Sequence, residues 1–333
     1  MPQIAALTTV DYEIFGDGSG SIHETLVAKT DFLLDCFRSL GIKATFFVEI
    51  EEIYRFRTDK VEGWDLIEQQ LTRIISEGHE VALHVHPQWI EAEYDRTAGQ
   101  YIVDDEAWKM DKVFQGKALT EYLTSRRSML TELLFDLGHS VEIVGFRAGG
   151  YNVGDPATNA GAIQAAGLSY DASVVVGATA AGPYSEYDFS KNTRPQEFGS
   201  GINAFSSIPI SSFKYNKAAY FTPSMLKRGQ KPKLRVSKGT QKVTRLAKIM
   251  NILKINRGPV DFVLLPTWLV GLAVLTSRGA GYIQVVGHNK SVVSEQRVYK
   301  NLKLLAKLFD TSRTLKTEHK RLATGYKGHA HGH

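Results

Sequence analysis

Two histidines stand two residues apart at the end of an apolar run. Residues 81–83 predict a short buried strand, and Pro87 ends it because proline has no backbone N–H to donate. Residues two apart on a strand point to the same face, so we expect His84 and His86 to present their imidazoles together. Two converging imidazoles form half of a site for a borderline metal ion such as zinc.

A second pair of potential ligands follows the first apolar run of the chain. Asp11 and Glu13 are also two residues apart, so the same geometry puts both carboxylates on one strand face. Two carboxylates and two histidines, each pair at the carboxyl end of an apolar run, indicate a hydrolytic metal centre. In the alternative interpretation the histidines are hydrogen-bonded loop residues and Asp11 caps the following turn, because short patterns of this kind recur by chance.

Six segments, taken in order, resemble the motifs of the polysaccharide deacetylase family (NodB homology, carbohydrate esterase family 4). They are residues 9–13, 41–48, 78–84, 145–151, 167–173 and 285–290. Together they span nearly the whole chain. The branch that they resemble most is the WalW-like group associated with lipopolysaccharide biosynthesis.

Two positions depart from the motifs of that family. The metal motif of the family has a second histidine four residues after the first, where this chain has Gln88 after His84. Either His86 supplies the missing nitrogen or the metal site is weakened. The second aspartate of the first motif is replaced by Tyr12, which leaves Glu13 as the nearest carboxylate that could reach a metal.

The resemblance implies a metal-dependent hydrolase that removes N-acetyl groups from an amino sugar in a cell-surface polysaccharide or lipopolysaccharide precursor. The substrate would be an acetylated amino sugar or glycan, with a lipid-linked form as one option. His84 and His86 would bind a divalent transition metal, with zinc expected, and Glu13 or Asp11 would be the third ligand. Such a metal polarises the acetamide carbonyl and lowers the pKa of water.

The same resemblance implies the remaining catalytic roles. Asp11 would be the general base, and Arg147 would orient it and keep it ionised. His288 would protonate the departing sugar nitrogen, and the backbone amide of Tyr151 would donate to the oxyanion. The alternative for Arg147 is a salt bridge that closes the barrel, and the alternative for His288 is a core histidine.

Two other functions remain open at this point. One is a metal-free hydrolase of the same fold that acts on another C–N bond. The other is a catalytically silent glycan-binding protein that lost turnover when glutamine came to occupy position 88. Tightly bound metal would separate the enzyme from the binding protein.

Strand-like runs alternate with helical patterns along the chain. The runs are residues 4–10, 44–49, 80–86, 141–146, 171–176, 205–210 and 282–288, and the helical patterns are residues 23–40, 64–77, 117–137 and 156–166. This alternation predicts an α/β fold with a parallel sheet. The resemblance narrows it to a distorted, incomplete (β/α) barrel of the NodB type, in which chemistry collects at the carboxyl ends of the strands. We expect the barrel at residues 1–310, with a basic insertion at about 211–258, and a histidine-rich, disordered tail at 311–333.

Composition is that of a soluble globular protein, with 43% apolar and 23% charged residues. The single cysteine, Cys36, excludes an internal disulfide and is expected to serve packing. No basic region followed by a long apolar stretch opens the chain, so we expect a cytoplasmic location, with the inner face of the membrane as one option. Residues 262–276 are apolar but too short, and too interrupted by Pro266 and Gly271, to span a membrane.

Positive charge is concentrated in one stretch. Residues 198–260 contain 13 lysines and arginines and no acidic residue. Such a segment could attract an anionic glycan, a lipid-linked phosphate or a membrane surface, including through the amphipathic residues 244–255. We expect no nucleic acid, because the stretch has few aromatic residues and no recognisable binding module. The alternative is a solvated loop followed by a basic helix.

Overall fold

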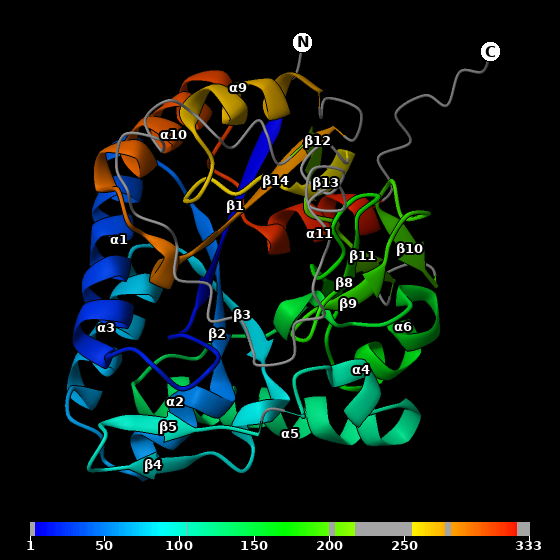
Figure 1. Ribbon diagram of the computed structural model, residues 1–333. Helices are drawn as coiled ribbons and strands as arrows, with labels where there is room; N and C mark the ends of the chain where they lie inside the picture. Colours follow the sequence, from blue (N-terminus) through cyan, green and yellow to red (C-terminus); the bar gives the residue numbers. More distant parts are fainter. Residues whose placement is uncertain (1–3, 105, 200–203, 217–254, 277–280, 325–333) are drawn as a thin grey trace, which may run out of the picture.

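An open, curled sheet of eight strands forms the centre of the protein (Figure 1). The computed structural model describes residues 4–104, 106–199, 204–216, 255–276 and 281–324. The strand order is β10-β11-β7-β6-β3-β2-β1-β14, and all neighbours are parallel except β10 and β11. The bounds are β1 (Ala5–Tyr12), β2 (Ala44–Glu49), β3 (Glu80–Val85), β6 (Gly145–Ala148), β7 (Tyr170–Asp171), β10 (Gln196–Phe198), β11 (Phe205–Ser207) and β14 (Tyr282–His288).

Helices surround the sheet on its outer side (Figure 1). They are η1 (Ile22–Val27), α1 (Ala28–Leu40), α2 (Ile50–Thr58), α3 (Trp64–Ser76), α4 (Met110–Val113), α5 (Gly116–Asp136), α6 (Pro156–Ala165), α9 (Thr267–Thr276) and α10 (Glu295–Leu308). Three two-stranded sheets add to this frame: β4 (Glu93–Asp95) with β5 (Gln100–Ile102), β8 (Thr179–Ala181) with β9 (Glu186–Asp188), and β12 (Ser212–Asn216) with β13 (Ile255–Pro259). The predicted α/β fold with a distorted, incomplete barrel is confirmed, whereas α2, α10 and the small sheets were not predicted.

Alternate residues of the central strands face two different layers. Ala6 and Val10 of β1 belong to the large core between the sheet and the helices, whereas Ala5 and Leu7 belong to a smaller cluster inside the curl. Strand periodicity therefore turns Asp11 to the inner side as well. The inner cluster consists of Ala5, Leu7, Phe47, Ala82, Val144, Tyr170, Ala172, Ile208, Tyr282 and Leu315. The inside of the curl is thus apolar near the amino ends of the strands and polar near their carboxyl ends.

One further helix, α11 (Leu315–Ala323), lies within the segment for which a tail was predicted. Leu315 is buried in the inner cluster, and its backbone N–H donates to Thr45 Oγ1 at 3.1 Å. The next N–H, that of Lys316, donates to Glu80 Oε2 at 2.9 Å. These contacts join α11 to the central strands, so the helix is part of the packed barrel. Residues 325–333 lie outside the described residues.

Other predicted segments are described only in part. Of the basic insertion, β12 and β13 are described, and residues 217–254, with the amphipathic pattern predicted there, lie outside the described residues. In the described part of the chain, no helix is long and apolar enough to cross a membrane. Cys36 is buried on α1, where burial raises the pKa of its thiol to about 11, as suits a packing residue.

We predict that Gly145→Ala destabilises the barrel. A Cβ at Gly145 would lie 2.1 Å from the hydroxyl oxygen of Tyr170, which donates to Glu80 Oε1 at 2.6 Å and therefore cannot move aside freely. The free energy of unfolding, measured in urea, should fall by about 1–3 kcal/mol through overpacking. Gly161→Ala is the matched control, because Gly161 is exposed on α6 with open space around it. That variant should gain up to about 1 kcal/mol from helix propensity; equal stabilities would contradict the prediction.

Candidate active site

Four of the residues predicted to carry chemistry meet at the carboxyl ends of neighbouring strands. The register pairs Asp11 of β1 with His288 of β14, and His84 of β3 with Arg147 of β6. Each of these side chains follows an apolar stretch of its strand, as the sequence indicated. Three of them are buried, and the side chain of His288 retains 22% of its exposure, so this end of the cluster is open to solvent.

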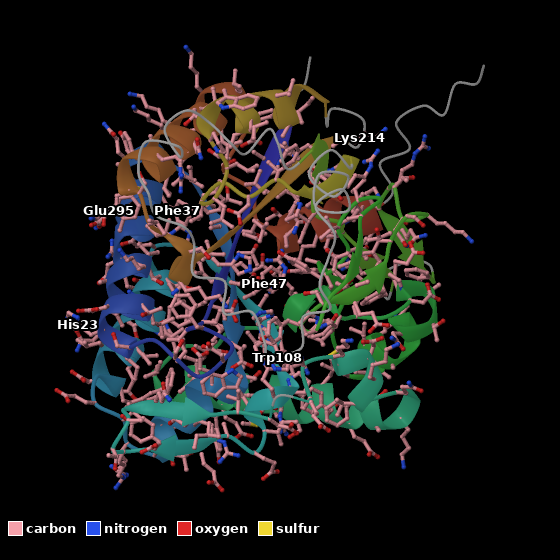
Figure 2. The ribbon with its side chains drawn as sticks, in the orientation of Figure 1. His23, Phe37, Phe47, Trp108, Lys214 and Glu295 are labelled. Carbon is pink, nitrogen blue, oxygen red and sulfur yellow. The ribbon has the colours of Figure 1, made fainter. Side chains whose placement is uncertain are left out.

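The centre of the site is an ion pair between Arg147 and Asp11. Arg147 is fully buried, and its guanidinium donates to Asp11 Oδ1, to Thr9 Oγ1 at 3.0 Å and to the carbonyl of Ala172 at 3.0 Å. It also stands 4.0 Å from the centre of the Phe47 ring, in a cation–π contact near the middle of the molecule (Figure 2). Burial alone would raise the pKa of Asp11, but Arg147, His288 and His84 together outweigh burial and hold that pKa far below its ordinary value.

The second partner of Asp11 is His288. Nε2 of His288 lies 3.3 Å from Asp11 Oδ2, and Nδ1 lies 3.9 Å from Asp261 Oδ2. Burial works against a charge on the ring, but the Asp11 carboxylate outweighs burial and raises the pKa of His288 above 6.5. The ionised Asp11 carboxylate therefore lies beside an imidazole that holds its proton more tightly than usual, and the two pKa values are moved apart. This is the division expected of a base and an acid in one site.

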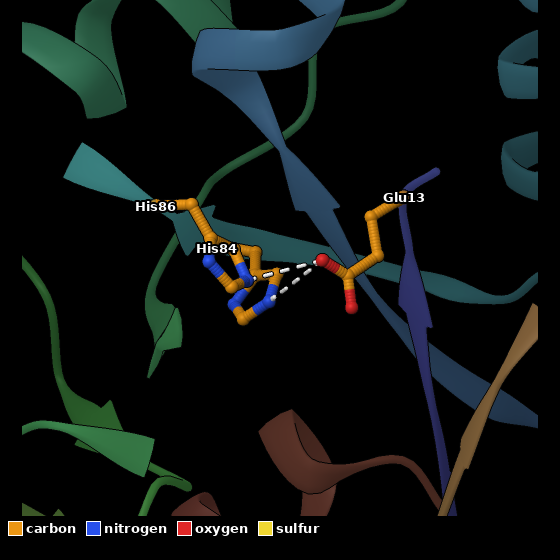
Figure 3. Close-up of side chains that lie close together, drawn as sticks. All are labelled: Glu13, His84 and His86. Atoms are coloured by element: carbon orange, nitrogen blue, oxygen red, sulfur yellow. Dashed lines mark ion pairs between the residues drawn. The ribbon is translucent and has the colours of Figure 1, made fainter. Parts of the chain in front are cut away.

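A second cluster adjoins this pair and consists of Glu13, His84 and His86. One potential ligand atom from each of the three lies within 4.8 Å of the others, and all three residues are buried. Oε2 of Glu13 is 3.0 Å from Nε2 of His86 and 3.9 Å from Nε2 of His84 (Figure 3). Asp11 and Glu13 also form a group with His288, but the oxygens of Asp11 face Arg147 and His288. Glu13 is thus the carboxylate nearest to both imidazoles.

The protonation of His84 suits a metal ligand. Its Nδ1 lies 2.8 Å from the backbone carbonyl of Arg147, which can only accept, so the proton is on Nδ1 and the lone pair is on Nε2. Nε2 is buried and has no hydrogen-bond partner. Burial lowers the pKa of His84 to about 4, so the ring is neutral at physiological pH. An unpartnered, buried imidazole nitrogen beside a second imidazole and a carboxylate is a donor set that fits zinc.

Lys290 is a site residue that the sequence analysis missed. Its Nζ lies 2.7 Å from Glu13 Oε1, on the opposite oxygen from the histidines. Burial opposes ionisation of Glu13, but Lys290 and then His86 outweigh it and hold the pKa of Glu13 well below its ordinary value. The position of Lys290, two residues after His288, was a signal that could have identified it. Asp261, which lies near His288, gave no such signal: it precedes an apolar run, whereas the predicted site residues follow one.

Two buried glutamates behind the cluster hold the backbone that carries its ligands. Glu49 Oε1 accepts from the N–H of His86 at 2.9 Å, and Glu52 Oε1 accepts from the N–H of Ile14 at 2.8 Å. Burial raises the pKa of both carboxyl groups well above the ordinary value. The end of β2 and the first turn of α2 therefore fix the loop after β1 and the end of β3 relative to each other. The sequence analysis missed both residues: Glu52 lies on α2, which was not predicted, and Glu49 ends a predicted strand but contacts His86 only through the tertiary fold.

The loop after β6 carries the last predicted residue, Tyr151. Its φ of 64° is in the left-handed region, which is uncommon for a residue other than glycine and often marks a functional loop. Its hydroxyl group is buried without a hydrogen-bond partner. The same loop passes close to His86: a Cβ at Gly149 would lie 2.5 Å from Nδ1 of that ring. Asp171 supports the loop through Ser173, whose Oγ accepts from a backbone N–H of β6.

We predict that Asp11→Asn lowers the pKa of His288. In the wild type, protonation of His288 stabilises the fold below its unfolded-state pKa of about 6.5, and this contribution is lost as pH rises through its higher folded-state pKa. Removing the Asp11 charge leaves burial as the larger influence, so the ring should titrate at lower pH. Imidazole NMR signals followed against pH measure this shift. His319 on α11 is the internal control, and an equal shift there would contradict the prediction.

The fold has counterparts of known structure, although no family model and no curated protein matches the chain. A candidate polysaccharide deacetylase from Mycobacterium smegmatis is 14% identical, with a TM-score of 0.51 over 97% of this chain and 91% of that one. PuuE allantoinase is 12% identical with a TM-score of 0.47 over 97% and 92%. The peptidoglycan deacetylase PdaC from Bacillus subtilis is 12% identical with a TM-score of 0.39 over 97% and 94%. The first match shows that the chain has the barrel of NodB-type deacetylases.

Proposed function

We propose that the protein is a metal-dependent hydrolase that removes N-acetyl groups from an amino sugar of a glycan. The observation that carries this proposal is the position of the Glu13–His84–His86 cluster beside an Asp11–His288 pair with opposite pKa shifts. A metal site next to an acid–base pair can hydrolyse an amide, because the metal polarises the carbonyl while the pair transfers the protons. The barrel fold is consistent with this function but is not sufficient evidence for it, because a fold alone does not determine activity.

Zinc is the proposed metal, because two imidazoles and a carboxylate are its usual ligands in hydrolytic sites. Glu13, His84 and His86 would hold it, and His84 needs no change of protonation to do so. When bound, the metal polarises the acetamide carbonyl and lowers the pKa of water in the site. Lys290 would remain on the other oxygen of Glu13 and keep that carboxylate ionised.

Asp11 and His288 would share the proton transfers. Asp11 takes a proton from the attacking water, and Arg147 orients it for this step, at the expense of basicity because the ion pair lowers its pKa. His288, 3.3 Å away and with a raised pKa, gives a proton in its protonated form to the departing amine and can recover one from Asp11. We assign the oxyanion to the backbone amide of Tyr151, whose left-handed conformation is unusual enough to suggest such a role.

The substrate class is an acetylated amino sugar within a larger glycan. A cavity of about 720 Å³ begins at Ile14, next to Glu13, and is lined by Tyr94 and Tyr101 among others. Neither the Glu13–His84–His86 cluster nor the Asp11–His288 pair lines this cavity. The cavity would therefore hold sugar rings away from the bond that is cleaved. A second aromatic surface, outside this cavity, lies beside His86. It consists of Trp108 and Tyr184, whose ring centres are 4.5 Å apart (Figure 2 shows Trp108). Aromatic surfaces of this kind suit sugar rings.

We further propose that the glycan is a cell-surface polysaccharide or lipopolysaccharide precursor, carried by a lipid phosphate at the inner face of the membrane. The support is charge: residues 198–260 contain 13 cationic residues and no acidic one. The described ends of this stretch meet in the β12–β13 pair, where Lys214 is opposite Arg257. Positive segments of this kind attract anionic headgroups.

A metal-free hydrolase of another C–N bond is a second candidate, and one observation favours it. Lys290 forms an ion pair with Glu13, so this buried carboxylate has a cationic partner within the protein itself. In that case the Asp11–His288 pair would act alone on a more reactive substrate. Metal content separates the two candidates.

We predict that purified protein binds about one zinc ion per chain, as expected of a single site, and that His84→Ala abolishes this binding. The reason is that His84 contributes the buried nitrogen with no other partner. Elemental analysis after removal of loosely bound metal measures the number of zinc ions per chain. His79→Ala is the matched control, because His79 is also buried with a pKa lowered to about 4 but packs between Phe37 and Phe46. Retention of zinc by His84→Ala would rule out the assigned cluster.

We predict that Asp11→Asn and His288→Ala lower kcat for acetate release by about 10²–10⁴-fold, as expected when a positioned base or acid is lost. A panel of free and lipid-linked acetylated amino sugars provides the assay. The alkaline limb of the wild-type pH profile should follow deprotonation of His288, above 6.5, and should be absent in His288→Ala. The stability of Asp11→Asn must also be measured by urea unfolding, because Asp11 forms an ion pair with the buried Arg147 and its loss could destabilise the fold.

The outcomes of this assay separate the functions. Near-wild-type turnover in both variants would place the chemistry elsewhere in the barrel. Zinc-loaded wild-type protein that binds the glycans but releases no acetate from any of them would favour a catalytically silent glycan-binding protein.

A further inference from the structure

Gln88 contacts the ring nitrogen of His86 that faces away from Glu13. It lies in the short helix η2 (Pro87–Trp89) and is fully buried. Its Nε2 is 3.0 Å from Nδ1 of His86, whereas the other ring nitrogen, Nε2, is 3.0 Å from Glu13 Oε2. The residue that takes the place of the motif histidine is therefore a partner of a ligand and is not itself in the ligand cluster.

This contact determines which nitrogen of His86 carries the proton. An amide nitrogen only donates, so Nδ1 of His86 accepts and has no proton. In the neutral ring the proton is then on Nε2, where it is donated to Glu13. A metal ion needs the lone pair of this same Nε2. The arrangement described here thus keeps His86 in the tautomer that cannot bind metal.

His84 provides the contrast within the same site. Its Nδ1 faces a backbone carbonyl, which can accept a hydrogen bond but cannot donate one. The proton therefore stays on Nδ1, and the lone pair of Nε2 is available to a metal ion. A glutamine side chain can make that exchange, because its oxygen and nitrogen are nearly equal in size. Among the described residues, Oε1 of Gln88 is buried without a hydrogen-bond partner in the present orientation, and Nε2 has one other hydrogen bond, at 3.5 Å to the carbonyl of Gly16.

We propose that the Gln88 amide rotates by half a turn when the site binds metal. In the orientation described here Nε2 donates to Nδ1 of His86; after the rotation Oε1 would accept from an Nδ1–H, and the lone pair of Nε2 of His86 would be available to the metal. Gln88 is then a positioning residue that couples metal occupancy to the tautomer of His86. The inference rests on the proposed metal centre and concerns how this chain manages without the second motif histidine.

Zinc affinity, measured by competition with a chromophoric chelator, tests the role of Gln88. Gln88→Met keeps the length of the side chain but cannot accept, so zinc affinity should fall by about 10–100-fold, as for other partners of ligating histidines. Gln88→Glu can accept without rotating, so its affinity should equal or exceed that of the wild type. Gln70→Met is the matched control: Gln70 is also buried, donates through Nε2 to the carbonyl of Val27 at 2.9 Å and has an unpartnered Oε1. It lies on α3 and should leave zinc affinity unchanged.

Nitrogen NMR of the histidine rings tests the rotation itself, because it distinguishes protonated from unprotonated ring nitrogens. At a pH where His86 is neutral, the metal-free wild type should have a protonated Nε2 and an unprotonated Nδ1. Zinc should move the proton to Nδ1, whereas His84 should have a protonated Nδ1 in both states. A metal-free His86 that already carries its proton on Nδ1 would overturn the proposal.

The affinity series separates the possible failures. Zinc binding with unchanged affinity in Gln88→Met would overturn the role of Gln88 and leave the metal centre intact. Absence of zinc binding in the wild type would overturn the metal centre and the rotation together.

Discussion

A fully buried guanidinium is the constraint on which the rest of the site depends. The charge of Arg147 is far from solvent, and breaking such a pair by removing one partner typically costs about 3–5 kcal/mol. The fold therefore has to supply compensation on every side: the Asp11 carboxylate, the hydroxyl of Thr9 and the face of Phe47. Once Asp11 is fixed and ionised in this way, it raises the pKa of His288 beside it. One structural ion pair thus shifts the pKa values of the groups that would do chemistry.

The carboxyl groups around the Glu13–His84–His86 cluster differ in their pKa shifts. Glu13 is ionised because Lys290 holds one of its oxygens, whereas the two glutamates behind the cluster have raised pKa values and are bonded to backbone N–H groups. Burial and repulsion from neighbouring carboxylates, including that of Glu13 on Glu52, therefore raise the pKa values of the two glutamates, whereas Lys290 and His86 lower that of Glu13. Glu49 and Glu52 act as hydrogen-bond acceptors for the backbone, and Glu13 alone is left with a charged oxygen facing the imidazoles.

The sequence was sufficient to predict what depends on local periodicity. Residues two apart share a strand face, so the grouping of His84 with His86 and the turn of Asp11 to one face could be anticipated, as could the alternation of strands and helices. What depends on contacts between distant segments could not. Asp261 belongs to the site because it is bridged to β14, and Lys290 because β14 lies beside β1. The role of Gln88 depends on the direction of a single hydrogen bond, which no spacing rule contains.

The pairing of the first strand with the last has a consequence for synthesis of the chain. β1 contacts β2 along one edge, but its other edge pairs with β14, whose residues are made long after those of β1. At about 5–20 residues per second the delay is on the order of tens of seconds. During that time an apolar strand edge is unpaired, and open edges of this kind can pair with other chains. A chain truncated before β14 would keep that edge of β1 open and could not complete its sheet.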